Sequence, residues 1–144
     1  MNTFLLLIHL LGLALALGAA TVKLTLLLWC GTDPVLVAVF VRVAKPITRI
    51  LLAGMGLLII SGGSWLALGW PFSSLLAVKL ALVAAVLVLG PIIDKKAEPA
   101  LARVAPAPDS ALGTAFLRAR RGYVALEVAA TALLGAITVL GVLL

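Results

Sequence analysis

The sequence has few ionisable or nucleophilic side chains. Only 11% of its 144 residues are charged, five of these are acidic, and the chain holds one histidine and one cysteine. Soluble domains carry about a quarter charged residues, so the composition excludes a soluble enzyme and a disordered chain. The single Cys30 excludes an intrachain disulfide, and the single His9 excludes a two-histidine metal site within one chain.

Long apolar runs make up most of the sequence instead. Apolar residues account for 65% of the chain, and a membrane-spanning helix needs about 20 of them in succession. Four runs reach that length, at about residues 4–29, 47–68, 75–93 and 122–144. We therefore predict an all-α fold, a transmembrane four-helix bundle that forms a single membrane domain over residues 1–144 and contacts the lipid bilayer.

Shorter segments connect these runs. Residues 35–45 are too short to cross the membrane and are followed by Pro46, which breaks or kinks a helix. Residues 111–121 are basic and amphipathic. We predict that both segments form interfacial lead-in helices, before spans two and four. Three prolines punctuate residues 94–121, which predicts a basic loop there.

The basic residues are distributed unevenly along the chain. Nine of the eleven lysines and arginines lie in or beside the first and third connections. Cytoplasmic loops of membrane proteins carry such an excess, so we expect loop 94–121 to be cytoplasmic and both termini to be periplasmic. The net charge of +6 indicates attraction to anionic lipid, and no nucleic-acid partner is expected.

Five ionisable residues fall inside the predicted spans. A charged side chain at the membrane centre costs about 2.5–3.5 kcal/mol, so these residues should face the bundle or reach an interface. His9 and Lys79 lie near the outer ends of spans one and three and can share one layer. Glu127 lies in the cytoplasmic third, as do Arg49 and Lys23, which predicts a structural ion pair of Glu127 with one of them.

Of these five residues, His9 can take the most chemical roles. Its helical face also holds Gly12, Ala16 and Ala20, and small residues are typical of faces that pack inside a membrane bundle. Three roles remain open for an inward imidazole: a neutral ring hydrogen-bonded within the structure, a haem or metal ligand, and a proton relay. For Lys79, the simplest role is to extend its ammonium to the outer interface.

Three stretches resemble helices of a superfamily of small bacterial membrane bundles. They are LIHLLG at 7–12 followed by Gly18, KPITR at 45–49 leading to IISGG at 59–63, and LAVKLALV at 76–83. The superfamily includes the HemJ-type protoporphyrinogen oxidase and the membrane domain of copper-resistance D-type proteins. The resemblance covers about residues 4–90, and it implies a bundle of four or more helices in a bacterial inner membrane.

The resemblance also implies a cofactor site. In the HemJ-type enzyme, a histidine of the first helix and a lysine of the third form the functional pair, and haem b is bound. His9 and Lys79 match those positions, so the resemblance implies a haem b site made by both, with His9 as the metal ligand. The chain lacks the enzyme's further histidines and aromatic residues, and the extra histidines and methionines of the copper-resistance proteins. This implies a branch apart from both.

Three functions are compatible with these features. The first is a haem-associated or redox-associated membrane protein, in which Lys79 lies near a propionate or an acidic substrate. The second is a non-catalytic accessory or assembly subunit of a larger membrane complex. The third is a small transporter built as a homodimer, with Glu127 and the basic residues beside it as its gate. Whether the chain is an enzyme stays open.

Overall fold

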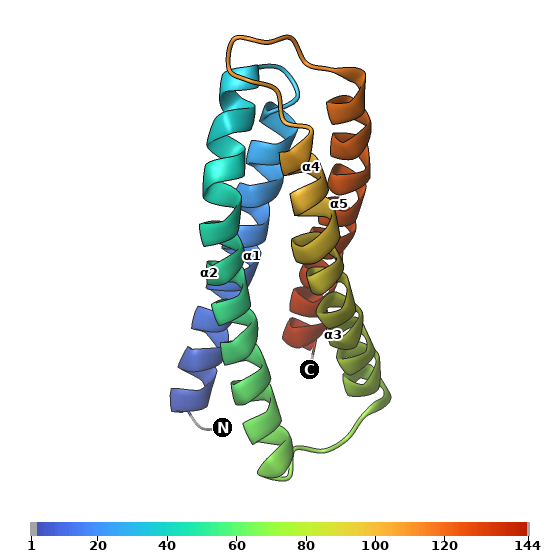
Figure 1. Cartoon of the computed structure of the whole chain (residues 1–144). Helices are drawn as coiled ribbons and strands as arrows, with labels where there is room; N and C mark the ends of the chain where they lie inside the picture. The colour runs from blue at the N-terminus through green and yellow to red at the C-terminus, as the bar shows by residue number, and fades with distance from the viewer. Residues whose placement is uncertain (1–2, 144) are drawn as a thin grey trace.

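The computed structural model describes residues 3–143 and is built of helices (Figure 1). Four helical segments are long and apolar enough to cross a membrane, so the predicted all-α four-helix architecture is confirmed and the chain is a multi-pass membrane protein. The helices are α1 (Thr3–Trp29), α2 (Pro34–Ala67), α3 (Ser74–Ile92), α4 (Glu98–Arg103) and α5 (Thr114–Leu143), with a π-helical turn (Ile93–Ala97) that joins α3 to α4.

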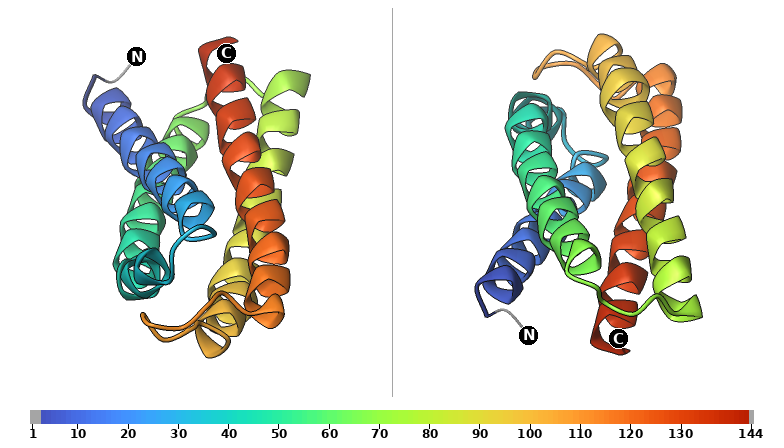
Figure 2. Two further views of the ribbon diagram at one scale, coloured as in Figure 1. Left: turned by 90° about the horizontal axis from the view of Figure 1, so that it is seen from above. Right: turned by 90° about the horizontal axis from the view of Figure 1, so that it is seen from below.

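The bundle consists of two helix pairs. Helix α1 packs along α2, α3 packs along α5, and contacts between α1 and α5 join the pairs (Figure 2). Both termini and the turn at 68–73 lie at one end, which we call the terminal end (Figure 1). The turn at 30–33 and the loop at 104–113 lie at the other, which we call the loop end.

The α1–α2 crossing depends on two glycines. A Cβ added to Gly54 would lie 2.6 Å from the backbone nitrogen of Ala16 and 2.7 Å from the carbonyl oxygen of Gly12. A Cβ added to Gly12 would likewise lie 2.8 Å from the carbonyl oxygen of Gly54. All three distances are too short for a side chain, so the close approach of these backbones requires glycine on each helix.

Helix α2 is longer than the sequence predicted. The expected lead-in segment 35–45 is helical, but it continues through Pro46 into the second span without a break. Because Pro46 has no N–H, the helix lacks one hydrogen bond, to the carbonyl of Arg42. That carbonyl belongs to an exposed residue near the loop end. The Asp33 carboxylate caps the helix by accepting a 2.8 Å hydrogen bond from the backbone N–H of Val35.

The predicted basic loop at 94–121 is mostly helical. The chain stays helical to Arg103, and α5 already begins at Thr114, so the second lead-in segment joins the fourth span directly. Two features explain the difference. Pro99 stands at the start of α4, where its missing N–H costs little, and Ile93 and Leu101 are buried in the bundle. The burial of these apolar side chains favours the helix over a solvated loop.

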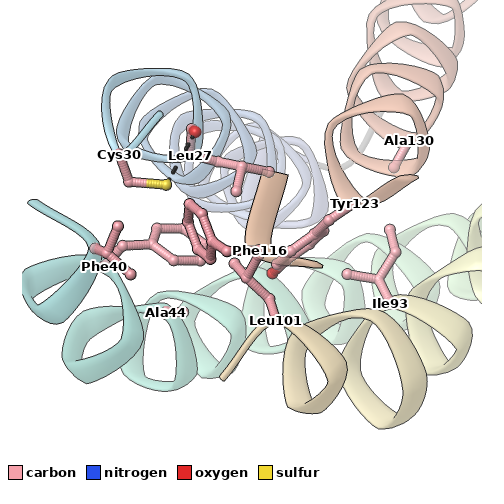
Figure 3. Packing of buried hydrophobic residues seen from close by; sticks show 10 residues of the cluster. Leu27, Cys30, Phe40, Ala44, Ile93, Leu101, Phe116, Tyr123 and Ala130 are labelled. Carbon is pink, nitrogen blue, oxygen red and sulfur yellow. Dashed lines mark hydrogen bonds between the residues drawn. The ribbon is translucent and has the colours of Figure 1, made fainter. Parts of the chain in front are cut away.

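The loop end of the bundle is closed by apolar side chains. Phe40 and Tyr123 pack edge to face with ring centroids 5.8 Å apart, and the Phe116 ring lies beside Phe40 (Figure 3). Arg120 also closes this end, because its guanidinium donates hydrogen bonds to the carbonyls of Leu27 and Leu28, at 3.1 and 2.7 Å. These carbonyls end α1 and have no partner within it.

Candidate functional site

A cavity of about 560 Å³ lies toward the terminal end, between the two helix pairs. All four long helices contribute to its wall, and its lining is mainly apolar. A Cβ added to Gly62 or Gly63 in this wall would meet no atom within 4 Å, so these positions leave open space beside the helices. The volume falls in the range of small-molecule sites, about 300–1,000 Å³.

His9 is held in the wall of this cavity by a hydrogen bond to Ser61. The His9 Nδ1 atom lies 2.9 Å from the Ser61 hydroxyl oxygen. That hydroxyl has one proton, and it also lies 2.7 Å from the Leu57 carbonyl and 3.2 Å from the Leu58 carbonyl, which can only accept. We assign the proton to the shortest of these contacts, to Leu57, so that Ser61 accepts from an Nδ1–H group of His9. This arrangement leaves the lone pair of the neutral imidazole on Nε2.

Lys79 lines the same cavity from α3. Its ammonium lies against Gly141 of α5, where a Cβ would approach the Nζ atom to 3.0 Å. Among residues 3–143, the ammonium has no hydrogen bond and no ion pair, and no acidic side chain lines the cavity. The structure therefore places His9 and Lys79 in the wall of one cavity, and within residues 3–143 it gives the ammonium no partner.

Trp65 completes the polar part of the wall. Its ring packs against His9 with centroids 5.1 Å apart and against Trp70 at 6.0 Å. Its indole Nε1 atom is buried and finds no hydrogen-bond partner in the described part of the chain. A buried N–H without an acceptor costs about 1–3 kcal/mol, so the packing of Trp65 against His9 and Trp70 carries that cost.

A separate polar cluster lies between the cavity and the loop end. The Lys23 ammonium is 3.1 Å from Glu127 and 3.0 Å from Glu98, and it donates a 2.7 Å hydrogen bond to Thr48. Tyr123 donates to the same Glu98 oxygen at 3.3 Å. Lys23 and Glu127 are almost fully buried, whereas the Glu98 side chain retains 15% of its exposure. The cluster joins four helices and carries one more negative than positive charge.

The structure distinguishes the two cations that were expected beside Glu127. It brings Lys23 to that carboxylate, whereas Arg49 is exposed and makes no ion pair within residues 3–143. Arg49 points away from the cluster because it follows Thr48 directly, and consecutive helical residues lie about 100° apart. Arg120, in the segment expected to form an interfacial lead-in helix, caps α1 through the carbonyls of Leu27 and Leu28, and a Cβ at Gly31 would collide with its guanidinium.

Sequence reasoning missed three of these residues. Glu98 was assigned to a loop because of the prolines around it, although Ile93, Ala97 and Leu101 repeat at the four-residue spacing of a buried helix face. Trp65 gave no signal of a contact with His9, because a tryptophan near the end of a span is typical of a membrane interface. Ser61 gave no signal of its own, because serine is common in membrane helices and its pairing with His9 depends on how α1 and α2 cross.

Comparison of the chain with family models, curated proteins and solved structures finds no match.

Proposed function

We propose that the chain is a small haem-binding membrane protein with a redox role, and that the terminal-end cavity holds haem b. The observation that carries this proposal is the state of His9. The Nδ1–H group is fixed by Ser61, and Nε2 is left as a free nitrogen donor on a ring that lines an apolar cavity. Metal-ligating histidines use their second nitrogen in this way, which fixes the ring and its tautomer.

The other residues of the cavity also suit haem. Its apolar walls suit a hydrophobic macrocycle, and Gly62 and Gly63 leave room beside it. The free ammonium of Lys79 suits a propionate, since a lysine–carboxylate contact is a charge-assisted hydrogen bond. In this assignment, His9 would ligate the iron and Lys79 would neutralise a propionate.

The protein's part in this function is to bind the haem and hold it in place. Bound haem would supply one-electron redox chemistry. Ser61 would hold the His9 ring in place with Nε2 as its free nitrogen, and the apolar wall would surround the macrocycle. Because the chain has only one histidine, it would supply one imidazole ligand, and ligation by two histidines would require a homodimer.

The absorption spectrum of detergent-purified protein tests this function. We expect protein produced with ample haem to show a Soret band, and dithionite to convert the spectrum to that of a ferrous haem. A colourless protein that takes up no added haem would contradict the proposal. The accessory-subunit interpretation would then take its place, and it predicts co-purification with a larger membrane complex.

A further inference from the structure

A second cavity, which we call the loop-end pocket, lies between α2 and the segment formed by the π-helical turn and α4. Its volume is about 420 Å³. Glu98 lines it from α4, and the other ionisable residues of its wall are Lys45 of α2 and Asp94 and Lys95 of the turn. A water molecule needs about 30 Å³ and polar partners. The pocket offers both, so water from the loop end can reach Glu98.

Glu98 connects this pocket to the buried polar cluster. Its Oε2 atom lies 3.0 Å from the Lys23 ammonium, 3.3 Å from the Tyr123 hydroxyl and 3.5 Å from the Thr48 hydroxyl. The Oε1 atom of Glu127 lies 3.1 Å from the same ammonium, but it is buried and accepts no hydrogen bond from the described residues. Three donors therefore surround one carboxyl group of the cluster, whereas the deeper one lacks them.

The charges of the cluster do not balance when both acids are ionised. Glu98 and Glu127 then carry two negative charges against the single positive charge of Lys23. An uncompensated charge inside a membrane protein is costly. The other charged groups on the elements packed around the cluster and its pocket make no ion pair within residues 3–143. They are Lys45 and Arg49 of α2, which are exposed, and Asp94 and the exposed Lys95 of the turn.

We infer that the polar cluster is a proton-binding site, which takes one proton from the loop-end pocket through Glu98 and holds it on Glu127. Glu98 accepts the proton from water and transfers it to the neighbouring carboxylate, and no other bond forms or breaks. Burial without donors disfavours the charged form of a carboxyl group, which favours Glu127 as the holder. Proton binding here goes beyond the proposed function, because it involves neither haem nor the terminal-end cavity.

The site is open toward one end of the bundle. Along α1, the buried Ala16 and Ala20 lie between Lys23 and His9. Both alanines belong to an apolar core cluster that also holds Leu134 of α5. This core separates the polar cluster from the terminal-end cavity, so the proton exchanges with the loop end.

Infrared spectroscopy of the full chain in lipid nanodiscs tests the site, because the C=O stretch of a carboxylic acid is distinct from that of a carboxylate. We expect the wild type to show the band of one carboxylic acid at neutral pH. Glu127→Gln should lose it. Glu98→Gln should lose it too, because Lys23 then balances the remaining carboxylate. Asp109→Asn, which removes an exposed acid of the loop, should retain it.

Lys23→Met changes the charge in the opposite direction. Without the ammonium, the two carboxyl groups should keep the acid band to a higher pH than in the wild type. Because this variant is also expected to be less stable, the two glutamine variants test the site independently of it. A wild type with no acid band at neutral pH, or a band that persists in both glutamine variants, would show that the cluster does not hold the proton.

The route is tested by the isotope shift of the same band after rapid mixing with deuterium oxide. Ala102 is exposed and lines the loop-end pocket, so Ala102→Trp should fill the pocket and lengthen the half-time of the shift. Ala67→Trp is the matched control, because Ala67 is exposed near the terminal end, and it should exchange like the wild type. If Ala67→Trp slows the shift and Ala102→Trp does not, the proton enters from the terminal end and the inferred route is wrong.

Discussion

The Nδ1 atom of His9 lies 2.9 Å from the hydroxyl oxygen of Ser61, although the two residues are 52 positions apart and belong to different helices. The contact is possible because α1 and α2 approach closely where Gly12 meets Gly54. The helix crossing thus brings to the only histidine in the chain the hydroxyl that orients its ring. That ring lines the terminal-end cavity.

Removal of the Ser61 hydroxyl should weaken haem binding without abolishing it. Ser61→Ala leaves Nε2 of His9 in place but removes the acceptor that orients the ring. Loss of such a supporting hydrogen bond typically lowers metal affinity by about 10–100-fold. We therefore expect a weaker haem affinity and a Soret band that is still present, measured by titration of the apoprotein with haem.

Ser64→Ala is the matched control for this change. Ser64 lies on the same helix and donates the same kind of hydrogen bond, to the Ile60 carbonyl at 2.7 Å, but within residues 3–143 no hydrogen bond joins it to His9. Its loss should leave haem affinity unchanged. Equal affinities in the Ser61 and Ser64 variants would show that the Ser61 contact does not support the ligand.

The ion cluster predicts an order of stabilities. Lys23→Met leaves Glu98 and Glu127 buried together without a cation, and removal of one member of a buried pair costs about 3–5 kcal/mol in soluble proteins. Glu127→Gln should be milder, because Glu98 still lies 3.0 Å from the Lys23 ammonium. We expect the midpoint of thermal unfolding in detergent to fall most for Lys23→Met and less for Glu127→Gln.

Arg49→Met serves as the control for these two variants. Arg49 carries the other positive charge expected near Glu127, but it is exposed and makes no ion pair among the described residues. The variant should unfold at the wild-type temperature. If it is as destabilised as Lys23→Met, Arg49 compensates Glu127 after all, and our account of the cluster is incorrect.

The close approach of α1 and α2 can be tested by the addition of a single methyl group. Gly54→Ala places a methyl group against the backbone of α1, and overpacking of this kind costs about 1–3 kcal/mol. Gly56→Ala adds the same methyl group to the same helix where no atom lies within 4 Å. We expect Gly54→Ala to lower the unfolding temperature and Gly56→Ala not to lower it. Because the crossing positions Ser61, this variant should also bind haem less tightly, whereas Gly56→Ala should not.

Cysteine labelling tests the orientation in the membrane. Cys30 is fully buried and its thiol donates to the Leu27 carbonyl at 3.1 Å. Burial raises the pKa of this thiol, against the opposing effect of the Arg120 charge. The thiol stays protonated to a higher pH than an ordinary cysteine, and the thiolate is the reactive form. The parent chain should therefore be unreactive near pH 7 and give a clean background.

New cysteines at the two ends should then differ. Phe72 is 71% exposed in the turn at the terminal end, and Thr32 is exposed at the loop end. We expect a membrane-impermeant maleimide to label Phe72→Cys in cells with a permeabilised outer membrane, and to label Thr32→Cys only after lysis. The opposite pattern would reverse the orientation that the distribution of lysine and arginine predicts.

The sequence predicted features that depend on one helix at a time. The lengths of the apolar runs predicted the four spans. Depth along each span predicted that Lys79 and His9 can share one layer, and that Lys23 is a candidate partner of Glu127. The sequence could not predict features that depend on how two helices meet. Ser61 reaches His9 only through the crossing of α1 and α2. Glu98 enters the bundle because buried Ile93 and Leu101 keep the chain helical past Pro91 and Pro99, a competition that proline content alone did not reveal.

The most direct test of the central claim is a haem titration of the wild-type and His9→Ala apoproteins, followed through the Soret band. Our account predicts a saturable Soret band of ligated haem in the wild type. It predicts none in His9→Ala, while both proteins keep the same helical circular dichroism and the same thermal unfolding. If His9→Ala binds haem with wild-type affinity and an unchanged spectrum, or if the wild type binds none, His9 is not the ligand and the proposed function is wrong.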